Sequence, residues 1–182
     1  MNQKNLTQFA LAAVIVMVGI SARFLPHPYN FSPIAAIALF SGVYFSKKIA
    51  LTLPIIILAI SDIFLGSYEI GLMATVYGCF IVNTLIGFWL KNHKKWHTVI
   101  GSAIVGSILF YIVTNFAVWA FAPWYQKTML GLLQSYINAL PFFRNAVLGD
   151  LFYVSIFFAL YEPASQWLAK KMSQKHTQTT IA

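Results

Sequence analysis

Charge is scarce in this sequence, and acidic charge most of all. Only 9% of the 182 residues are charged and 59% are hydrophobic, whereas a soluble domain carries about 25% charged residues. This balance excludes a soluble globular protein. Only four residues are acidic, against 12 Lys and Arg. Because no basic stripe lies on a soluble face, this excess predicts positively charged membrane loops and not nucleic-acid binding.

Several catalytic and structural signatures are also missing. The single cysteine, Cys79, excludes an internal disulfide. The chain has no Walker loop, paired-glycine dinucleotide motif, nucleophile elbow or clustered zinc signature. ATP-driven chemistry within the chain is therefore excluded, and no intrinsic cofactor is expected. Energy for any transport must come from a partner or a gradient, or none is used.

The hydrophobic residues fall into stretches long enough to cross a membrane. They predict an all-α integral membrane protein, with residues 1–182 forming a single domain that is a bundle of six transmembrane helices. A separate interfacial helix is expected over residues 127–140, and a disordered polar tail over residues 172–182. The expected spans are residues 6–22, 32–45, 49–65, 70–90, 98–122 and 142–161.

Basic residues are distributed unequally between the two sides of this six-span arrangement. One side receives nine of the 12 basic residues, and the other receives only Arg23, Lys127 and Arg144. The positive-inside rule therefore predicts that both termini are cytoplasmic. The chemically unusual residues then lie on the outer side, which favours a binding site that opens outward.

Four charged residues near the outer side need compensation, because an ionised side chain at the bilayer centre costs about 2.5 to 3.5 kcal/mol. Arg144 and Asp150 lie about 9 Å apart along one helix and about 120° apart around it, so each is expected to find its partner on another helix. Asp62 is the obvious partner for Arg144, and Arg23 for either acid. A structural salt bridge among Arg23, Asp62 and Arg144 and direct ligand contact both remain open.

The predicted fourth helix carries a stripe formed by Glu69, Val76, Cys79 and Asn83, since these residues are seven, three and four positions apart. Cys79 either packs as a small hydrophobe or faces a cavity as a soft ligand. In the second case Asn83 and the neighbouring Tyr77 join the candidate ligand-binding residues.

Three motifs resemble those of a known family. They are the segment Arg23-Phe24-Leu25-Pro26-His27-Pro28-Tyr29-Asn30-Phe31-Ser32-Pro33, the pair Ser61-Asp62, and the segments Pro141-Phe142-Phe143-Arg144-Asn145 and Gly149-Asp150-Leu151-Phe152-Tyr153. They resemble small bacterial inner-membrane proteins similar to the substrate-binding S components of energy-coupling-factor (ECF) transporters, and BtuM-type cobalamin transporters in particular.

The resemblance implies a multi-pass protein of the bacterial inner membrane that takes up cobalamin (vitamin B12) or a related corrinoid. It also implies that Cys79 is an axial ligand to cobalt, a soft donor suited to that metal, with reductive decyanation as a side activity. Asp62, Arg144, Asp150 and His27 would shape the ligand pocket. The first helix lacks a small-xxx-small alanine pair, which argues against docking on an energising ECF module and favours a solitary transporter.

Two other functions are compatible with the same residues. The first is S-type uptake of another vitamin or small solute, for which Cys79→Ala would leave binding intact. The second is a membrane enzyme or an accessory scaffold. An enzyme would need an acid–base pair, and Asp62 with His27 is the only outward pair that the sequence offers.

Overall fold

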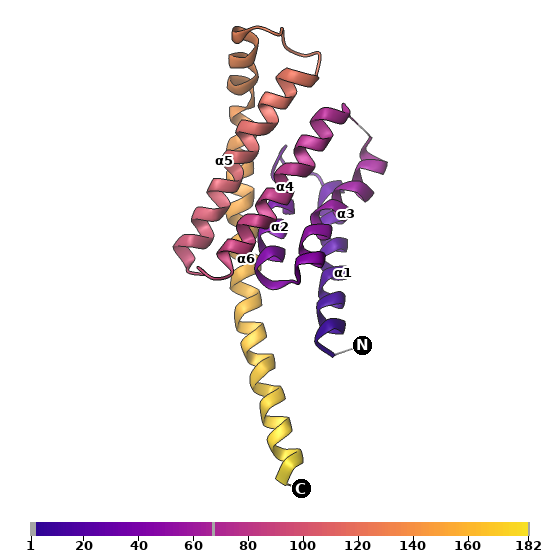
Figure 1. Ribbon diagram of the computed structural model, residues 1–182, viewed down its shortest axis with the longest axis vertical. Coiled ribbons are helices and arrows are strands. Elements are labelled where there is room, and N and C mark those ends of the chain that lie inside the picture. The colour runs from indigo at the N-terminus through magenta and orange to yellow at the C-terminus, as the bar shows by residue number, and fades with distance from the viewer. Residues whose placement is uncertain (1–2, 67, 182) are drawn as a thin grey trace.

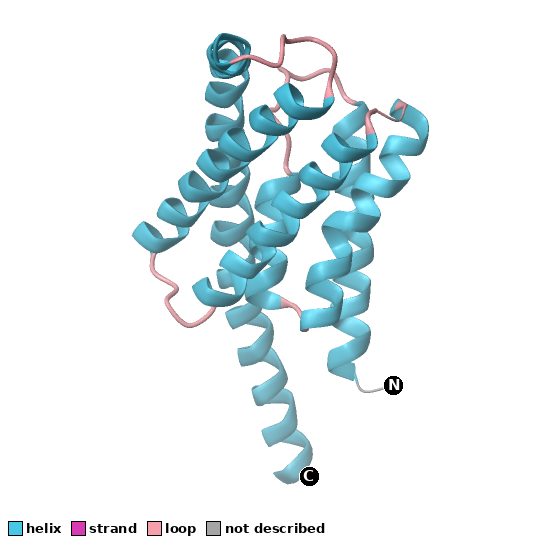
Figure 2. Cartoon of the chain, turned by 45° about the horizontal axis from the view of Figure 1, so that its top comes forward, coloured by secondary structure: helices cyan, strands magenta, loops and turns pink. Residues whose placement is uncertain are grey.

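A computed structural model describes residues 3–66 and 68–181, with side chains described for residues 11–66 and 68–163. These residues form six helices and no strand (Figures 1 and 2). The chain runs back and forth between the two ends of the bundle, and its connections lie at those ends (Figure 2). The helices are α1 (Gln3–Phe24), α2 (Ile34–Tyr44), α3 (Lys47–Leu65), α4 (Ile70–Leu90), α5 (Trp96–Phe121) and α6 (Met129–Ile181).

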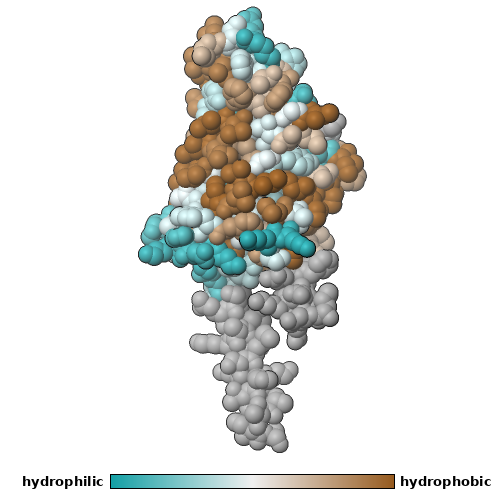
Figure 3. Space-filling view, in the orientation of Figure 1, coloured by the Kyte–Doolittle hydropathy of each residue, from teal (hydrophilic) through white to brown (hydrophobic). Residues whose placement is uncertain are grey.

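The outer surface of the bundle is apolar while several polar side chains lie inside it. Four helical segments are long and apolar enough to cross a membrane: Lys47–Leu65, Ile70–Leu90, Trp96–Phe121 and Met129–Pro163. Hydrophobic residues cover much of the middle of the visible face, with hydrophilic residues gathered toward its ends (Figure 3). Asn83, Thr84 and Ser107, by contrast, are at most 2% exposed. This arrangement fits a membrane-embedded protein.

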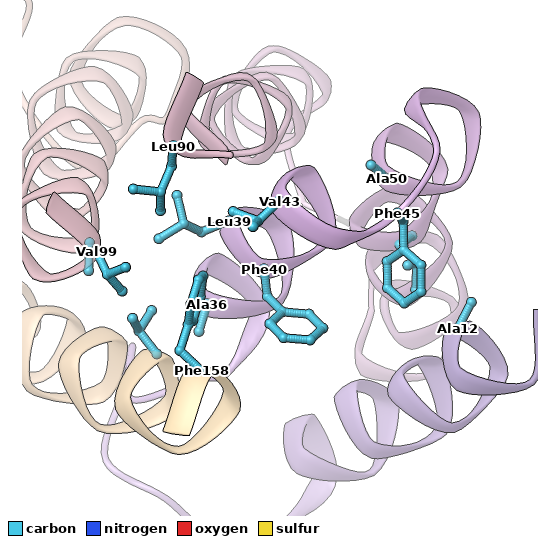
Figure 4. Close-up of a cluster of buried hydrophobic side chains, with 13 residues drawn as sticks. Ala12, Ala36, Leu39, Phe40, Val43, Phe45, Ala50, Leu90, Val99 and Phe158 are labelled. Carbon is cyan, nitrogen blue, oxygen red and sulfur yellow. The ribbon is translucent and has the colours of Figure 1, made fainter. Parts of the chain in front are cut away.

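Helix α2 is the centre of the fold, although it has only 11 residues. It packs against all five other helices, and its residues from Ala36 to Val43 are all buried. Phe40 packs edge-on against Phe158 of α6, and Leu39 belongs to the same core cluster as Leu90 of α4 (Figure 4). A helix that is apolar all round is typical of a fully enclosed position, so α2 organises the bundle around itself.

Two glycines let α2 and α4 cross at very short range. A Cβ atom built on Gly42 would lie 2.8 Å from Cα of Gly87, and one built on Gly87 would lie 2.9 Å from Cα of Gly42. Small residues at a crossing let two helix backbones approach closely, as is common in membrane bundles.

The proline inside α3 is accommodated by a side chain from α2. Pro54 has no N–H, so the carbonyl of Ala50 lacks its usual helical donor. The hydroxyl oxygen of Ser41 lies 3.1 Å from this carbonyl oxygen and 2.9 Å from that of Ala38. Serine side chains commonly supply the missing hydrogen bond at prolines in membrane helices.

The end of the chain differs from the sequence prediction. A separate interfacial helix over 127–140 is wrong, because α6 is one helix of 53 residues that contains Pro141 (Figure 1). Its first turns dock on α5 through two hydrogen bonds. The Tyr111 hydroxyl donates to the carbonyl of Tyr136 over 2.8 Å, and the Tyr136 hydroxyl donates to the carbonyl of Ile112 over 2.8 Å. The tail expected to be disordered from residue 172 is helical as far as Ile181; residue 182 lies outside the described residues.

The α2–α4 crossing predicts opposite effects for two identical substitutions in α4. We expect Gly87→Ala to lower the free energy of unfolding by about 1 to 3 kcal/mol, because the added methyl group forces two backbones apart. Gly78→Ala meets open space and is expected to be neutral or stabilising by up to about 1 kcal/mol. Thermal unfolding of the purified protein in detergent, followed by circular dichroism, measures both. Equal stability of the two variants would contradict the close crossing.

Candidate functional site

A cavity occupies the end of the bundle where α1 leads into α2. It consists of two adjoining chambers. The Asp150 chamber has a volume of about 540 Å³ and is lined by Arg23, His27, Ser32 and Asp150, among others. The Trp124 chamber has a volume of about 400 Å³ and is lined by Trp124, among others. The two chambers share the wall residues Tyr29, Tyr68, Val76, Ser107, Phe110 and Ala146, among others.

The segment between α1 and α2 forms one wall of this cavity. Residues 25–33 are not helical, and Asn30 has a positive φ of 65°, a conformation that asparagine tolerates better than most residues. Asn145 of α6 donates to the carbonyl of Tyr29 over 3.1 Å. A Cβ atom built on Gly149 would lie 3.1 Å from Cα of Phe31. The segment is thus held closely against α6.

An ion pair joins α1 to α3 beside the cavity. Nη1 of Arg23 lies 2.8 Å from Oδ1 of Asp62 and donates to the Ser61 hydroxyl over 2.6 Å. The Tyr77 hydroxyl of α4 donates to Oδ2 of Asp62 over 3.0 Å. Asp62 is therefore satisfied on both oxygens, and the arrangement ties three helices together. Of the pairings considered from the sequence, the structure contains Arg23 with Asp62.

Tyr68 lies between α3 and α4 and contributes a hydroxyl to both chambers. Burial, and secondarily the negative charge of Asp62, raises the pKa of Tyr68 to about 12, against a smaller opposing effect of Arg23. The hydroxyl stays protonated at neutral pH and is available as a hydrogen-bond donor.

Asp150 lies deep at the α5–α6 interface and lines the chamber named after it. It is 6% exposed, and its Oδ2 accepts a hydrogen bond of 2.6 Å from Ser107 of α5. Asp150 has its partner on another helix, but that partner is a hydroxyl, and an ion pair of Asp150 with Arg23 is a wrong prediction. Sequence reasoning missed Ser107.

Arg144 and His27 take different positions from those that the sequence suggested. Arg144 is exposed and forms no ion pair among the described residues. An ion pair of Arg144 with Asp62 is therefore a wrong prediction. His27 lines the Asp150 chamber, with Nδ1 lying 2.9 Å from the carbonyl oxygen of Pro28. Since Asp62 is bound by Arg23 and Tyr77, the structure provides no acid–base pair of Asp62 with His27.

Cys79 and Asn83 do not line either chamber. Each is 2% exposed, and the amide of Asn83 donates to the Cys79 carbonyl over 3.2 Å. The Asn83 side chain packs directly on Gly106 of α5. The interpretation of Cys79 and Asn83 as part of a pocket wall is wrong, because this part of α4 is used for packing inside the bundle. Val76 does line both chambers, and Glu69 instead accepts a hydrogen bond from the Leu72 amide at the start of α4.

The Trp124 chamber is largely aromatic. The ring of Tyr111 packs against that of Phe143 at 4.6 Å between centroids, and Thr114 and Asn115 add polar atoms from the same face of α5. Lys127 caps the C-terminal end of α5 by donating to the carbonyls of Trp119 and Ala122. Within the described part of the chain, no group of three His, Cys, Asp or Glu side chains could hold a metal ion.

Comparison with known proteins assigns the chain to a family. A family of unknown function, DUF6580, matches residues 2–174, so the chain belongs to this family. No curated protein and no solved structure matches the chain.

The ion pair predicts a strong energetic coupling between α1 and α3. We expect Arg23→Gln and Asp62→Asn each to lower the free energy of unfolding by about 2 to 4 kcal/mol, because each leaves an unpaired charge in apolar surroundings. In the double variant the free energy of unfolding should fall by less than the sum of the decreases in the two single variants. The difference is a coupling energy of about 1 to 3 kcal/mol. Arg144→Gln is the matched control and should change stability by less than about 0.5 kcal/mol. Strictly additive losses in thermal unfolding would argue against the pair.

Proposed function

We propose that this protein is a membrane solute-binding and uptake protein, similar to an ECF S component, which captures a vitamin or related small solute from the outer side of the membrane. The observation that carries this proposal is the cavity. Two chambers of about 540 and 400 Å³ lie inside an apolar-surfaced bundle and present aromatic rings together with a few polar groups. Ligand sites in proteins have this size and composition.

The proposal includes six membrane crossings in one domain, with both termini in the cytoplasm of a bacterial cell. Its support is the alternation of the helices and the position of the basic residues. Lys47 and Lys48 at the start of α3 and Lys91, Lys94 and Lys95 between α4 and α5 lie at the end of the bundle opposite to the cavity. Basic loops face the cytoplasm. The 11 residues of α2 complete a crossing together with the extended segment that precedes it.

A vitamin other than cobalamin is the better ligand for this cavity. Cobalamin is what the sequence resemblance implies, with Cys79 on cobalt. The Cys79 side chain is buried away from both chambers, and a corrinoid with its nucleotide loop is larger than the ligands that chambers of this size usually hold. The proposal includes uptake by the protein alone, without an energising module. Its support is that α1 lacks a small-xxx-small pair of alanines.

Binding by the purified protein tests this function. Thiamine, riboflavin, biotin, pantothenate and cobalamin are titrated against the tryptophan fluorescence of the protein in detergent, because Trp124 lines the cavity. We expect at least one compound to bind saturably and to compete for a single site. Cys79→Ala should bind it within about twofold of the wild type. Saturable cobalamin binding that Cys79→Ala abolishes would restore the cobalt-ligand hypothesis. Failure of every vitamin and every related small solute tested would contradict the proposal.

The outward opening predicts a pattern of thiol labelling. In a Cys79→Ala background, Asn138→Cys places a thiol on an exposed residue of the Trp124 chamber, and Asn92→Cys places one in the basic loop. A membrane-impermeant maleimide should label the first in intact cells and the second only after permeabilisation. Cys79 of the wild type should stay unlabelled in both conditions because it is buried. The reverse pattern for the two engineered cysteines would invert the orientation.

A further inference from the structure

Asp150 differs from the other three acidic residues of the chain in its electrostatic surroundings. Asp62 is paired with Arg23, and Glu162 with Lys94. Glu69 accepts the Leu72 amide at the N-terminus of α4, where the helix dipole favours negative charge. Asp150 is contacted by the Ser107 hydroxyl and forms no ion pair within the part of the chain that the structure describes.

This isolation is costly for an ionised carboxylate. A buried charge without a partner costs several kcal/mol, and compensation usually comes from an opposite charge together with hydrogen bonds. Two basic side chains line the same chamber: Arg23, whose charge is used by Asp62, and His27, whose Nδ1 lies 2.9 Å from the Pro28 carbonyl oxygen. The carboxylate of Asp150 therefore faces a cavity whose protein groups leave its charge without a counterion.

A second polar group in the same chamber also lacks a protein partner. The hydroxyl oxygen of Ser32 is buried and has no hydrogen-bond partner among the described residues, and Ser32 lines the Asp150 chamber. Ser32 and Asp150 belong to segments that lie against each other. Phe31 precedes Ser32, Gly149 precedes Asp150, and Cα of Phe31 lies against Gly149. An unsatisfied buried hydroxyl is destabilising unless a ligand supplies its hydrogen bond. Both groups line the same chamber and would be satisfied by a polar ligand inside it.

Four aromatic residues, Tyr29, Tyr68, Phe80 and Phe110, line this chamber together with aliphatic side chains. Phe110 lies one turn along α5 from Ser107, and its ring packs on that of Phe80 at 5.4 Å between centroids. Phe110, Tyr68 and Tyr29 line both chambers. Aromatic faces attract cations, more strongly when the cation is removed from water, and they stack well on planar rings.

We propose that the solute is a planar organic cation, with a quaternary or protonated ring nitrogen held by the carboxylate of Asp150 and its ring stacked among Phe110, Tyr68 and Tyr29. The Ser32 hydroxyl bonds a polar substituent of the same ring. Ser107 is a positioning residue that orients the carboxylate. This assignment rests on the proposed function and names the chemical class of its ligand.

Three probes that share one pyridine ring and differ in charge test this assignment. They are 1-methylnicotinamide, a cation; nicotinamide, its uncharged counterpart; and nicotinate, an anion. Each is titrated against the full-length protein in detergent by tryptophan fluorescence and by thermal shift. We expect the cation to bind at least tenfold more tightly than nicotinamide, and nicotinate to bind most weakly.

Variants assign this preference to Asp150. Asp150→Asn should weaken binding of 1-methylnicotinamide at least tenfold and change that of nicotinamide less than about threefold. Asp150→Glu keeps the charge and should retain preference for the cation, which separates loss of charge from misfolding. Glu162→Gln makes the same acid-to-amide change at the opposite end of the bundle and should leave all three affinities within about twofold of wild type. Ser107→Ala should reduce the cation preference without abolishing it.

The outcomes separate this inference from the proposed function. Equal or tighter binding of nicotinamide or nicotinate, or a cation preference that survives in Asp150→Asn, overturns the assignment of an organic cation. Saturable binding of an uncharged or anionic vitamin by a protein that does not bind 1-methylnicotinamide overturns it as well, while the proposed function stands. If no vitamin and no probe binds, both are overturned.

Discussion

The fold depends on how a chain with four acidic residues compensates charge inside an apolar bundle. Arg23 and Asp62 lie 2.8 Å apart and join α1 to α3, and the Tyr77 hydroxyl adds α4 to the same carboxylate. At the other end, Glu162 of α6 binds Lys94 and accepts the Tyr44 hydroxyl of α2. Because an unpaired charge is costly in buried surroundings, the Arg23–Asp62 pair fixes the helices that supply its members. The Lys94–Glu162 pair is more exposed, at 35% and 38%, and contributes less. Asp150 belongs to neither ion pair and is contacted by the Ser107 hydroxyl.

The interior is divided between close packing and open space. Toward the basic end, Gly42 and Gly87 bring α2 and α4 together, and Asn83 fills the space beside Gly106. Toward the other end, α2 gives way to an extended segment with no helix of its own, so side chains from α4, α5 and α6 border a cavity instead of a helix. Irregular backbone within a membrane is tolerated where it is buried in protein or lines such a cavity. The position of the cavity is thus a consequence of α2 beginning only at Ile34.

The sequence predicted the helices well, since five of the six expected spans correspond closely to helices, and four helices are long and apolar enough to cross a membrane. It missed the continuity of α6, because a proline at position 141 predicts a break, whereas the helix continues through it and its first turns pack on α5. It identified Asp62 and Asp150 as candidate ligand-binding residues, and Arg23 and Asp62 as candidates for an ion pair. It misjudged Cys79, because helical periodicity shows which residues share a face and not whether that face meets a helix or a cavity. Ser107 and Ser32 carry no signal in the sequence beyond being polar residues in apolar surroundings.

We propose that solute binds between Asp150 and the aromatic residues of the cavity. A crystal structure grown from a lipidic phase with saturating 1-methylnicotinamide tests it most directly. The claim predicts density for one probe molecule in the Asp150 chamber, with its ring against Phe110 and its charged nitrogen close to the Asp150 carboxylate. An empty chamber at saturating probe, or a probe bound only on the exterior of the bundle, would contradict it.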